Sequence, residues 1–389
     1  MINEEKYTKI IKSSTMKCRL SNNLGVSKIN ISTEKLERVV YERNEKEGKI
    51  YLMEDYSIIR KNKNNNKKRN KNIQRFRTPI SVRWDITYQC NFQCRHCYSS
   101  CSSKGINILK TEDAKKMFDI FEDAKVHFVQ ILGGEPLIRK DIYELVEYAL
   151  TKKYIFSLNS NGYLLDEDAA KKFSSLGLKN MQISLHGFED NHNMLTGVND
   201  SFNRAINAIK FLINSNINVS VSCLVSNINK DKIILFLNYL IEIGVKNIQL
   251  LTLLKEGRGK EENIGISENE SEILKKELIE FKKNHYDINI DLPGFDIDLI
   301  DGLVEFYKND NNYEFIFGCS GGVTSMRINP EGKACICVGS VSNPIGDVLR
   351  EPMSTIMKKM YQWRLDNVPL RCKDCEYYLY DCQGGCYLR

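Results

Sequence analysis

The sequence predicts an α/β fold built around a parallel sheet, and two observations support this fold class. Short apolar runs of strand length recur through the middle of the chain, and each is followed by a longer stretch with helical apolar spacing. Strands that alternate with helices in this way are typical of βα units. The predicted strands lie at about 80–87, 127–133, 154–159, 180–185, 218–225 and 247–253.

The helical stretches between these strands carry boundary signals. Thr111, which two acidic residues follow, is expected to cap the first helix, and Asp166 is expected to begin the third. Gly177 and Gly244 suit the left-handed position just past a helix end. These signals support the same alternation of strands and helices.

Three cysteines follow the first predicted strand, in the run Cys90-Asn-Phe-Gln-Cys94-Arg-His-Cys97. These spacings let one short loop hold three corners of an iron-sulfur cube, whose usual ligands are cysteine thiolates. One iron then has no protein ligand and can bind a chelating molecule, such as S-adenosylmethionine (SAM) through its amino and carboxylate groups. A zinc knuckle is the alternative, although zinc sites favour paired CxxC units with distant partners.

The cysteine loop resembles the signature of radical SAM enzymes. The resemblance implies a catalytic 4Fe-4S cluster on Cys90, Cys94 and Cys97 that injects an electron into the sulfonium of SAM and releases a 5'-deoxyadenosyl radical. His96 occupies a position that is often aromatic or apolar in this family and lies near the adenine, where an imidazole can stack. Tyr98 is expected to contact the cofactor as well.

The strand predicted at 127–133 ends in Gly133-Gly134-Glu135-Pro136. Two glycines let the backbone approach a ligand, and Glu135 can accept a hydrogen bond from an ammonium group. In the radical SAM family this stretch holds the methionyl amine. The resemblance therefore assigns these four residues to the cofactor site.

Two later strand ends are polar and contain glycine. Asn159 and Asn161 lie at one of them, and Ser184 precedes His186-Gly187 at the other. They resemble the ribose and carboxylate contacts of the family, although each stretch alone is an ordinary strand-to-helix turn. The order of these segments resembles the open (β/α)6 barrel of radical SAM enzymes, with cofactor groups at the C-terminal ends of the strands.

A segment beyond this point, with His192 and Thr196-Gly197, resembles a stretch common among peptide-modifying members of the family. Loops on this face of a barrel commonly meet substrate. We expect the segment to form a wall of the active site.

Seven of the thirteen cysteines fall in the last 71 residues. Their pattern resembles the SPASM extension, which holds auxiliary iron-sulfur clusters in radical SAM enzymes that modify peptides and proteins. A zinc ribbon is the alternative, since two CxxC-like pairs would satisfy one tetrahedral zinc. The candidate ligands are Cys319, Cys335, Cys337, Cys372, Cys375, Cys382 and Cys386.

The family pattern divides these cysteines between one or two auxiliary clusters. It groups Cys319 and Cys337 with Cys386, and it groups the three cysteines from Cys372 to Cys382 together, with Cys335 as an additional candidate ligand. Six residues rather than the usual five separate Cys375 from Cys382, and the sequence ends before the position of the family's final cysteine. The second cluster would then lack a protein ligand, be completed from outside, or belong to a chain truncated at its end.

Composition predicts a soluble, cytoplasmic protein. The chain has 389 residues, of which 42% are hydrophobic, and no apolar run reaches the roughly 18 residues of a membrane span. The N-terminus lacks the basic start and apolar stretch of a secretory signal. Cysteines grouped at ligand spacings in a long leaderless chain indicate metal sites in a reducing compartment.

Positive charge is concentrated in residues 60–77, which contain nine Lys or Arg and no acid. Asparagines rather than aromatic residues separate these charges, so a solvated linker is favoured over a nucleic-acid or membrane surface. Residues 1–58 include strand-like runs that suit peptide binding by strand addition, with a packing extension as the alternative. The predicted domains are an N-terminal module (1–58), a linker (59–78), a barrel (79–300) and a SPASM-like domain (301–389).

The resemblance implies a radical SAM peptide maturase. It would abstract hydrogen from a ribosomally made precursor peptide and form a thioether, as sactisynthases do, or another crosslink. Its partners would be the precursor and an electron donor such as flavodoxin or ferredoxin, and its cofactors SAM and 4Fe-4S clusters. The alternatives are sulfatase-maturase-like oxidation of Cys or Ser, and modification of a porphyrin or small molecule.

Overall fold

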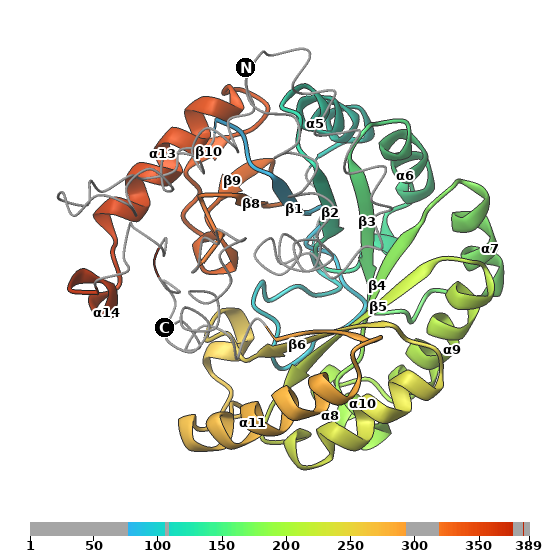
Figure 1. Ribbon diagram of the computed structural model, residues 1–389. Coiled ribbons are helices and arrows are strands. Elements are labelled where there is room, and N and C mark those ends of the chain that lie inside the picture. Colours follow the sequence, from blue (N-terminus) through green and yellow to red (C-terminus); the bar gives the residue numbers. More distant parts are fainter. Residues whose placement is uncertain (1–76, 106–108, 293–318, 376–383, 385–389) are drawn as a thin grey trace, which may run out of the picture.

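The computed structural model describes residues 77–105, 109–292, 319–375 and 384 (Figure 1). The predicted N-terminal module, Cys382 and Cys386 lie outside the described residues, as does nearly all of the predicted linker. In the described part of the chain, no helix combines the length and apolar character needed to cross a bilayer.

One ten-stranded sheet organises the described residues, in the order β10-β9-β8-β1-β2-β3-β4-β5-β6-β7. Strands β1 to β7 are parallel and lie side by side in chain order. Strand β8 adds to the free edge of β1, also in parallel, and β9 and β10 continue from it antiparallel. The strands are β1 (Ser81–Asp85), β2 (Phe128–Leu132), β3 (Ile155–Ser160), β4 (Asn180–Ser184), β5 (Asn218–Val225), β6 (Asn247–Thr252), β7 (Asn289–Asp291), β8 (Ser325–Ile328), β9 (Lys333–Cys335) and β10 (Gly346–Asp347).

The helices cover the outside of the curved sheet (Figure 1). The α-helices are α5 (Thr111–Asp123), α6 (Ile142–Leu150), α7 (Glu167–Ser175), α8 (Glu189–Thr196), α9 (Ser201–Asn214), α10 (Ile233–Glu242), α11 (Glu268–Asn284), α13 (Met353–Asp366) and α14 (Leu370–Lys373). Short 3-10 turns are η1 (Pro136–Ile138), η2 (Lys230–Lys232), η3 (Gly257–Lys260) and η5 (Val338–Ser340).

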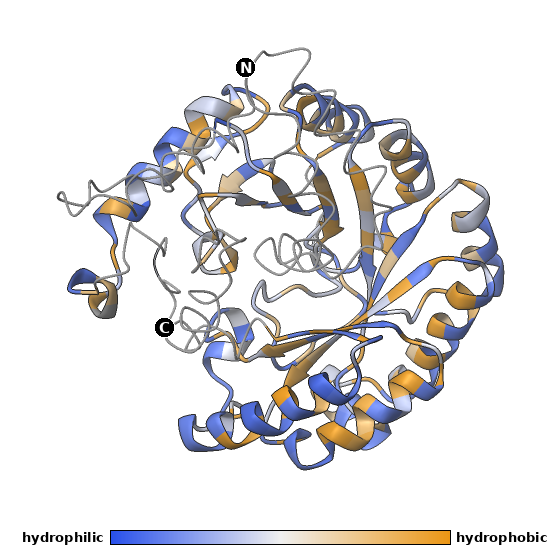
Figure 2. Ribbon diagram, viewed as in Figure 1, coloured by the Kyte–Doolittle hydropathy of each residue, from blue (hydrophilic) through white to orange (hydrophobic). Residues whose placement is uncertain are grey.

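The hydrophobic core lies between the sheet and these helices. Trp84 of β1 is fully buried, and its ring packs edge-on against Phe118 and Phe121 of α5, with centroids 5.4 and 6.0 Å apart. Figure 2 shows apolar residues along the strands and hydrophilic residues on the outer helices. Burial of this apolar surface, at about 25 cal/mol per Å², is the main force that holds the helices to the sheet.

The predicted α/β fold with a parallel sheet is confirmed. The six predicted strands correspond to β1 to β6. Gly177 and Gly244 follow α7 and α10 with φ of +93° and +92°, and Asp166 caps α7 by accepting from the main-chain N–H of Ala169 at 2.8 Å. The expectation for Thr111 was wrong, because Lys110 occupies the cap position of α5.

Candidate active site

The cysteine loop leaves the C-terminal end of β1 and folds back on itself. The main-chain N–H of Cys90 donates to the carbonyl oxygen of Ser102 at 2.9 Å, and that of Cys97 to the carbonyl oxygen of Cys94 at 3.2 Å. Cys90 is buried, and Cys94 and Cys97 are half-buried. Burial raises the pKa of the Cys90 thiol to about 12, so metal binding there must displace a proton.

Cys90, Cys94 and Cys97 are the predicted ligands of an iron-sulfur cube. Among the described residues, no three His, Cys, Asp or Glu side chains converge on a point where a single ion would sit. A cube does not require such convergence, because each cysteine binds a different iron. Cys101 is also buried here, packed with Cys90 and Phe92. The nearby Cys101 thiol is the largest of the influences that lower the pKa of the Cys97 thiol to about 6.

Arg258 of η3 fixes the cysteine loop from the opposite side. Its Nε donates to the carbonyl oxygen of Cys94 at 2.8 Å and its Nη1 to that of Cys101 at 3.0 Å. Its main-chain N–H donates to the carbonyl oxygen of Cys97 at 2.9 Å. Gly257 allows this approach, because a Cβ there would lie 2.4 Å from the carbonyl oxygen of Cys97, and its φ is +54°.

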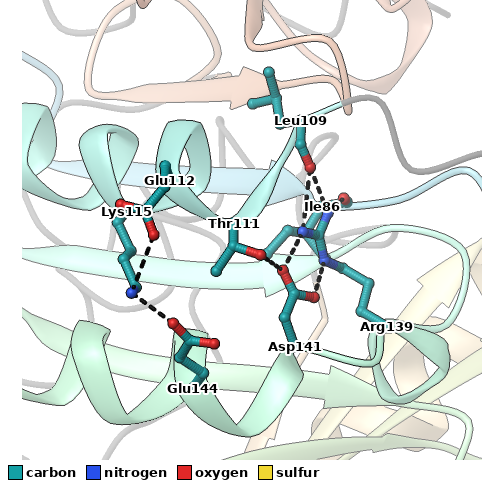
Figure 3. Close-up of polar contacts among 8 residues, drawn as sticks. All are labelled: Ile86, Leu109, Thr111, Glu112, Lys115, Arg139, Asp141 and Glu144. Atoms are coloured by element: carbon teal, nitrogen blue, oxygen red, sulfur yellow. Dashed lines mark hydrogen bonds and ion pairs between the residues drawn. The ribbon is translucent and has the colours of Figure 1, made fainter.

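A second arginine, Arg139, is buried and contacts the chain on both sides of the same loop. Arg139 follows η1, and its guanidinium donates to the carbonyl oxygens of Ile86 and Leu109 and, through two nitrogens, to both carboxylate oxygens of Asp141 (Figure 3). Asp141 also accepts from the hydroxyl of Thr111 at 2.7 Å. This contact explains why Thr111 does not cap its own helix. The arrangement joins the end of β1 to the starts of α5 and α6.

Glu135 is fully buried beside the cysteine loop. One carboxylate oxygen accepts from the main-chain N–H of Leu137 at 3.1 Å and the hydroxyl of Ser160 at 2.9 Å, and the other accepts from the main-chain N–H of Asn161 at 2.7 Å. Desolvation outweighs these bonds and raises the pKa of Glu135 to about 7. An ammonium group placed next to it would favour the ionised form.

The two glycines before Glu135 allow close packing between two backbone segments. The main-chain N–H of Gly134 donates to the carbonyl oxygen of Thr87, and that of Glu135 to the carbonyl oxygen of Gln89, both at 2.8 Å. A Cβ on Gly134 would lie 2.1 Å from the Gln89 oxygen, and Gly133 has φ of +139°. Pro136 begins η1 and is buried. The glycines therefore bring the acidic loop directly against the stretch that leads to Cys90.

The predicted asparagines lie in two different environments. Asn161 donates to the side-chain oxygen of Asn91 at 2.8 Å, which links the end of β3 to the cysteine loop. Asn159 points into the barrel, where its amide bridges Gln130 and Gln182 at 3.0 and 2.5 Å. Ser184 is half-buried at the end of β4, in register with Ser222. The roles of Asn159, Asn161 and Ser184 at the cofactor remain predictions.

Three histidine rings lie against one another, and one of them, His96, belongs to the cysteine loop. The ring of His96 meets that of His186 edge-on, with centroids 4.5 Å apart, and His186 lies 5.4 Å from His192. Desolvation lowers the pKa of His96 to about 4 and of His192 to about 3. Burial also lowers the pKa of His186 well below its usual value, so all three rings are neutral at pH 7. The segment with His192 is buried in α8, and Leu195 accepts from the main-chain N–H of Arg95 in the loop at 3.0 Å.

Tyr98 points toward the barrel interior and joins a buried ion pair. Arg327 of β8 donates to both carboxylate oxygens of Asp85, at 2.7 and 2.5 Å, and also to the hydroxyl of Tyr98. Burial raises the pKa of Tyr98 and keeps the phenol protonated. Strand β8 thus contributes Arg327, which contacts Tyr98 directly after the last cysteine of the loop. A contact between Tyr98 and SAM stays a prediction.

Five of the seven C-terminal cysteines are within the described residues. Cys335 ends β9 and is fully buried, and Cys337 follows it half-buried. The main-chain N–H of Cys319 donates to the carbonyl oxygen of Gly384 at 2.7 Å, which places Cys319 beside the chain between Cys382 and Cys386. Cys372 is buried in α14, and Cys375 follows it half-buried. Their assignment to auxiliary clusters remains a prediction.

Sequence comparisons identify the family of this site. Residues 84–240 match the Radical SAM superfamily. A probable GTP 3',8-cyclase from Saccharolobus islandicus is 30% identical over 301 residues, which cover 74% of this chain and 92% of that protein. The chain belongs to the radical SAM superfamily. Mycofactocin maturase MftC from Mycolicibacterium smegmatis is 31% identical over 182 residues, or 46% of each chain.

Solved structures show the same radical SAM fold. SuiB from Streptococcus suis bound to its precursor peptide SuiA superposes with a TM-score of 0.67 at 18% identity, covering 99% of this chain and 84% of SuiB. SuiB bound to SAM gives a TM-score of 0.65. This chain is accordingly a radical SAM enzyme that uses SAM and a 4Fe-4S cluster. The loop tied down by Arg258 and the buried carboxylate of Glu135 fit these two cofactors.

Proposed function

We propose that this enzyme matures a ribosomally made peptide, with the cluster on Cys90, Cys94 and Cys97 and with SAM held near Glu135. The bound cluster and SAM supply a 5'-deoxyadenosyl radical, which takes a hydrogen atom from the peptide. The chain's own contribution is to fix the loop through Arg258 and to enclose the reaction in a barrel. A thioether or another crosslink is the proposed product.

The observation that carries this proposal is the position of the cysteine-rich C-terminal segment. Strand β8 pairs with β1, so this segment continues the barrel sheet. Cys319 precedes β8 and lies near the barrel side chain Arg83, whose pKa it raises through its charge. Thioether formation removes one hydrogen atom, one proton and one further electron from the peptide. An auxiliary cluster on Cys319 and its neighbours would supply an acceptor for that electron.

The relatives support two substrate classes. SuiB is described with a precursor peptide and MftC as a maturase, and SuiB aligns with 99% of this chain. The GTP 3',8-cyclases align with 74% of this chain but with 92% of their own length, which favours a nucleotide as the second candidate substrate. Sulfatase-maturase-like oxidation of Cys or Ser remains a further alternative within the peptide class.

The deciding experiment uses anaerobically reconstituted protein, a reductant and SAM. We expect a Cys-containing precursor peptide encoded beside the gene to lose two hydrogen atoms per crosslink, as measured by mass spectrometry. GTP is the parallel substrate, and the triple variant Cys90→Ala, Cys94→Ala, Cys97→Ala is the control. Conversion of GTP with no change in any peptide would overturn the proposal.

The N-terminal segment can be tested in the same assay. We propose that residues 1–58 dock a leader peptide, and that their covalent attachment to the barrel raises the effective concentration of the substrate there. A variant that begins at Arg77 should still cleave SAM to 5'-deoxyadenosine. It should lose most precursor modification at low peptide concentration. Full precursor turnover by this variant would refute the docking role.

A further inference from the structure

Strand β1 directs three polar side chains into the barrel. Val82 and Trp84 are fully buried toward the helices, where Trp84 meets Phe118. Successive side chains of a strand point to opposite faces, so Ser81, Arg83 and Asp85 face the barrel interior. Arg83 and Asp85 are charged, and both lie on the strand that leads into the cysteine loop.

The two arginines of this interior differ in their partners. Arg327 forms a two-bond ion pair with Asp85. Arg83 lies in register with Arg327 on the neighbouring strand. Within the described ranges, its Nε is buried without a hydrogen-bond partner and its guanidinium forms no ion pair. A partly buried charge without a partner is costly, which indicates a position kept for a ligand.

Arg83 stays charged in this setting. Desolvation is the main cause that lowers its pKa to about 10, and the charge of Arg327 acts in the same direction. Tyr98, Asp291 and Cys319 are near enough to raise it. The interior therefore holds a permanent cation between the cysteine loop and the C-terminal segment.

We propose that Arg83 binds a carboxylate of the substrate inside the barrel, an inference that rests on the proposed peptide substrate. A guanidinium matches a carboxylate with two parallel hydrogen bonds. One unpaired cation suits a monoanion. The carboxylate belongs to an acidic side chain of the peptide or to its C-terminus, and the contact orients the peptide below the radical.

The test measures retention of peptides by reconstituted, SAM-bound protein in equilibrium dialysis with mass-spectrometric readout. In the first pair of synthetic octapeptide mixtures, one mixture has Glu at one set position and the other has Gln there, and both have amidated C-termini. A second pair lacks acidic residues and ends in a free carboxylate or an amide. We expect at least about tenfold stronger retention of the carboxylate member of one pair, as charge-assisted hydrogen bonds predict.

Variants assign this preference to the guanidinium. Arg83→Gln should lose the preference, and Arg83→Lys should keep part of it. Arg350→Gln, at an exposed arginine that pairs with Asp347 at 3.4 Å, is the matched control and should behave like the wild type. Iron content and SAM affinity, measured on each variant, should not change.

Two outcomes would overturn the inference. One is equal retention of both members in each pair by the wild-type protein, including no retention of any mixture. The other is a loss of SAM affinity in Arg83→Gln that matches the loss of peptide retention, which would place the carboxylate of SAM at Arg83. If the protein then still modifies a precursor peptide, only the carboxylate site at Arg83 is refuted. If it modifies no peptide at all, the proposed peptide-maturing function is refuted as well.

Discussion

The guanidinium of Arg258 donates to the main-chain carbonyl oxygen of Cys94 at 2.8 Å, across 164 residues of sequence. This contact ties the turn after β6 to the loop after β1. The carbonyl group of Cys94, one of the three predicted cluster ligands, is thereby held from the other side of the barrel.

Replacement of Arg258 should loosen the cluster. Arg258→Met removes two charge-assisted hydrogen bonds, each of about 1.5–3 kcal/mol, and leaves two carbonyl oxygens without these partners. We expect faster iron loss to a chelator, measured by the decay of the cluster absorbance. Arg350→Met, at a residue whose side chain is 83% exposed, is the matched control. Equal decay rates in the two variants would show that Arg258 does not support the loop.

Removal of the three loop cysteines should remove one cube. The triple variant Cys90→Ala, Cys94→Ala, Cys97→Ala should lose about four irons per chain and all reductive SAM cleavage, because thiolates are the cluster's protein ligands. Any C-terminal clusters should survive. An iron content equal to that of the wild type would contradict the assignment of the loop.

The C-terminal cysteines should bind iron of their own. Anaerobically reconstituted protein should hold clearly more than the about four irons of one cube. Cys335→Ala with Cys337→Ala should lower the iron content and leave the catalytic cluster's electron paramagnetic resonance signal in place. Zinc instead of iron in this region, by elemental analysis, would refute the SPASM-like interpretation.

The strands that the sequence could predict are the longer ones, β1 to β6, which have five to eight residues. Residues 218–225 were expected as a strand and form β5 with the same bounds, because seven of its eight side chains are buried. Strands β7 and β8 were not expected. They have three and four residues, and Asp291 and Arg327 each take one of these positions. Strands this short leave too few apolar residues to be recognised from the sequence.

The same limit applies to the site. Glu135 could be predicted because its loop has a local motif. Arg258 and Arg327 are single cations whose partners lie far along the chain, so no local pattern identifies those partners. For Arg258 the local signal is the pair of glycines that flank it, which allow a close backbone approach but do not indicate which segment approaches. Cys101 had no assigned role, and only its burial against the loop places it near the cluster.

Glu135 should make the stability of the enzyme depend on pH. Its pKa of about 7 in the folded protein lies above the usual value of 4.5 for a glutamate, because the carboxyl group is buried. Below pH 4.5 the folded and unfolded chains both hold the proton, and this contribution to stability is fully present. As the pH rises to 7 the folded state retains a proton that the unfolded state has lost, so the free energy of unfolding falls by about 3 kcal/mol.

Glu135→Gln should abolish this fall in the free energy of unfolding with pH. Any other effect of the substitution on stability should be the same at both pH values. The comparison is chemical denaturation of reconstituted, SAM-free protein at pH 5 and pH 7.5, and Glu147→Gln at an exposed position of α6 is the control. Saturating SAM should reduce the fall in the wild type, because an ammonium near the carboxylate lowers its pKa again. The same pH dependence in wild type and Glu135→Gln would show that Glu135 is not the group that titrates.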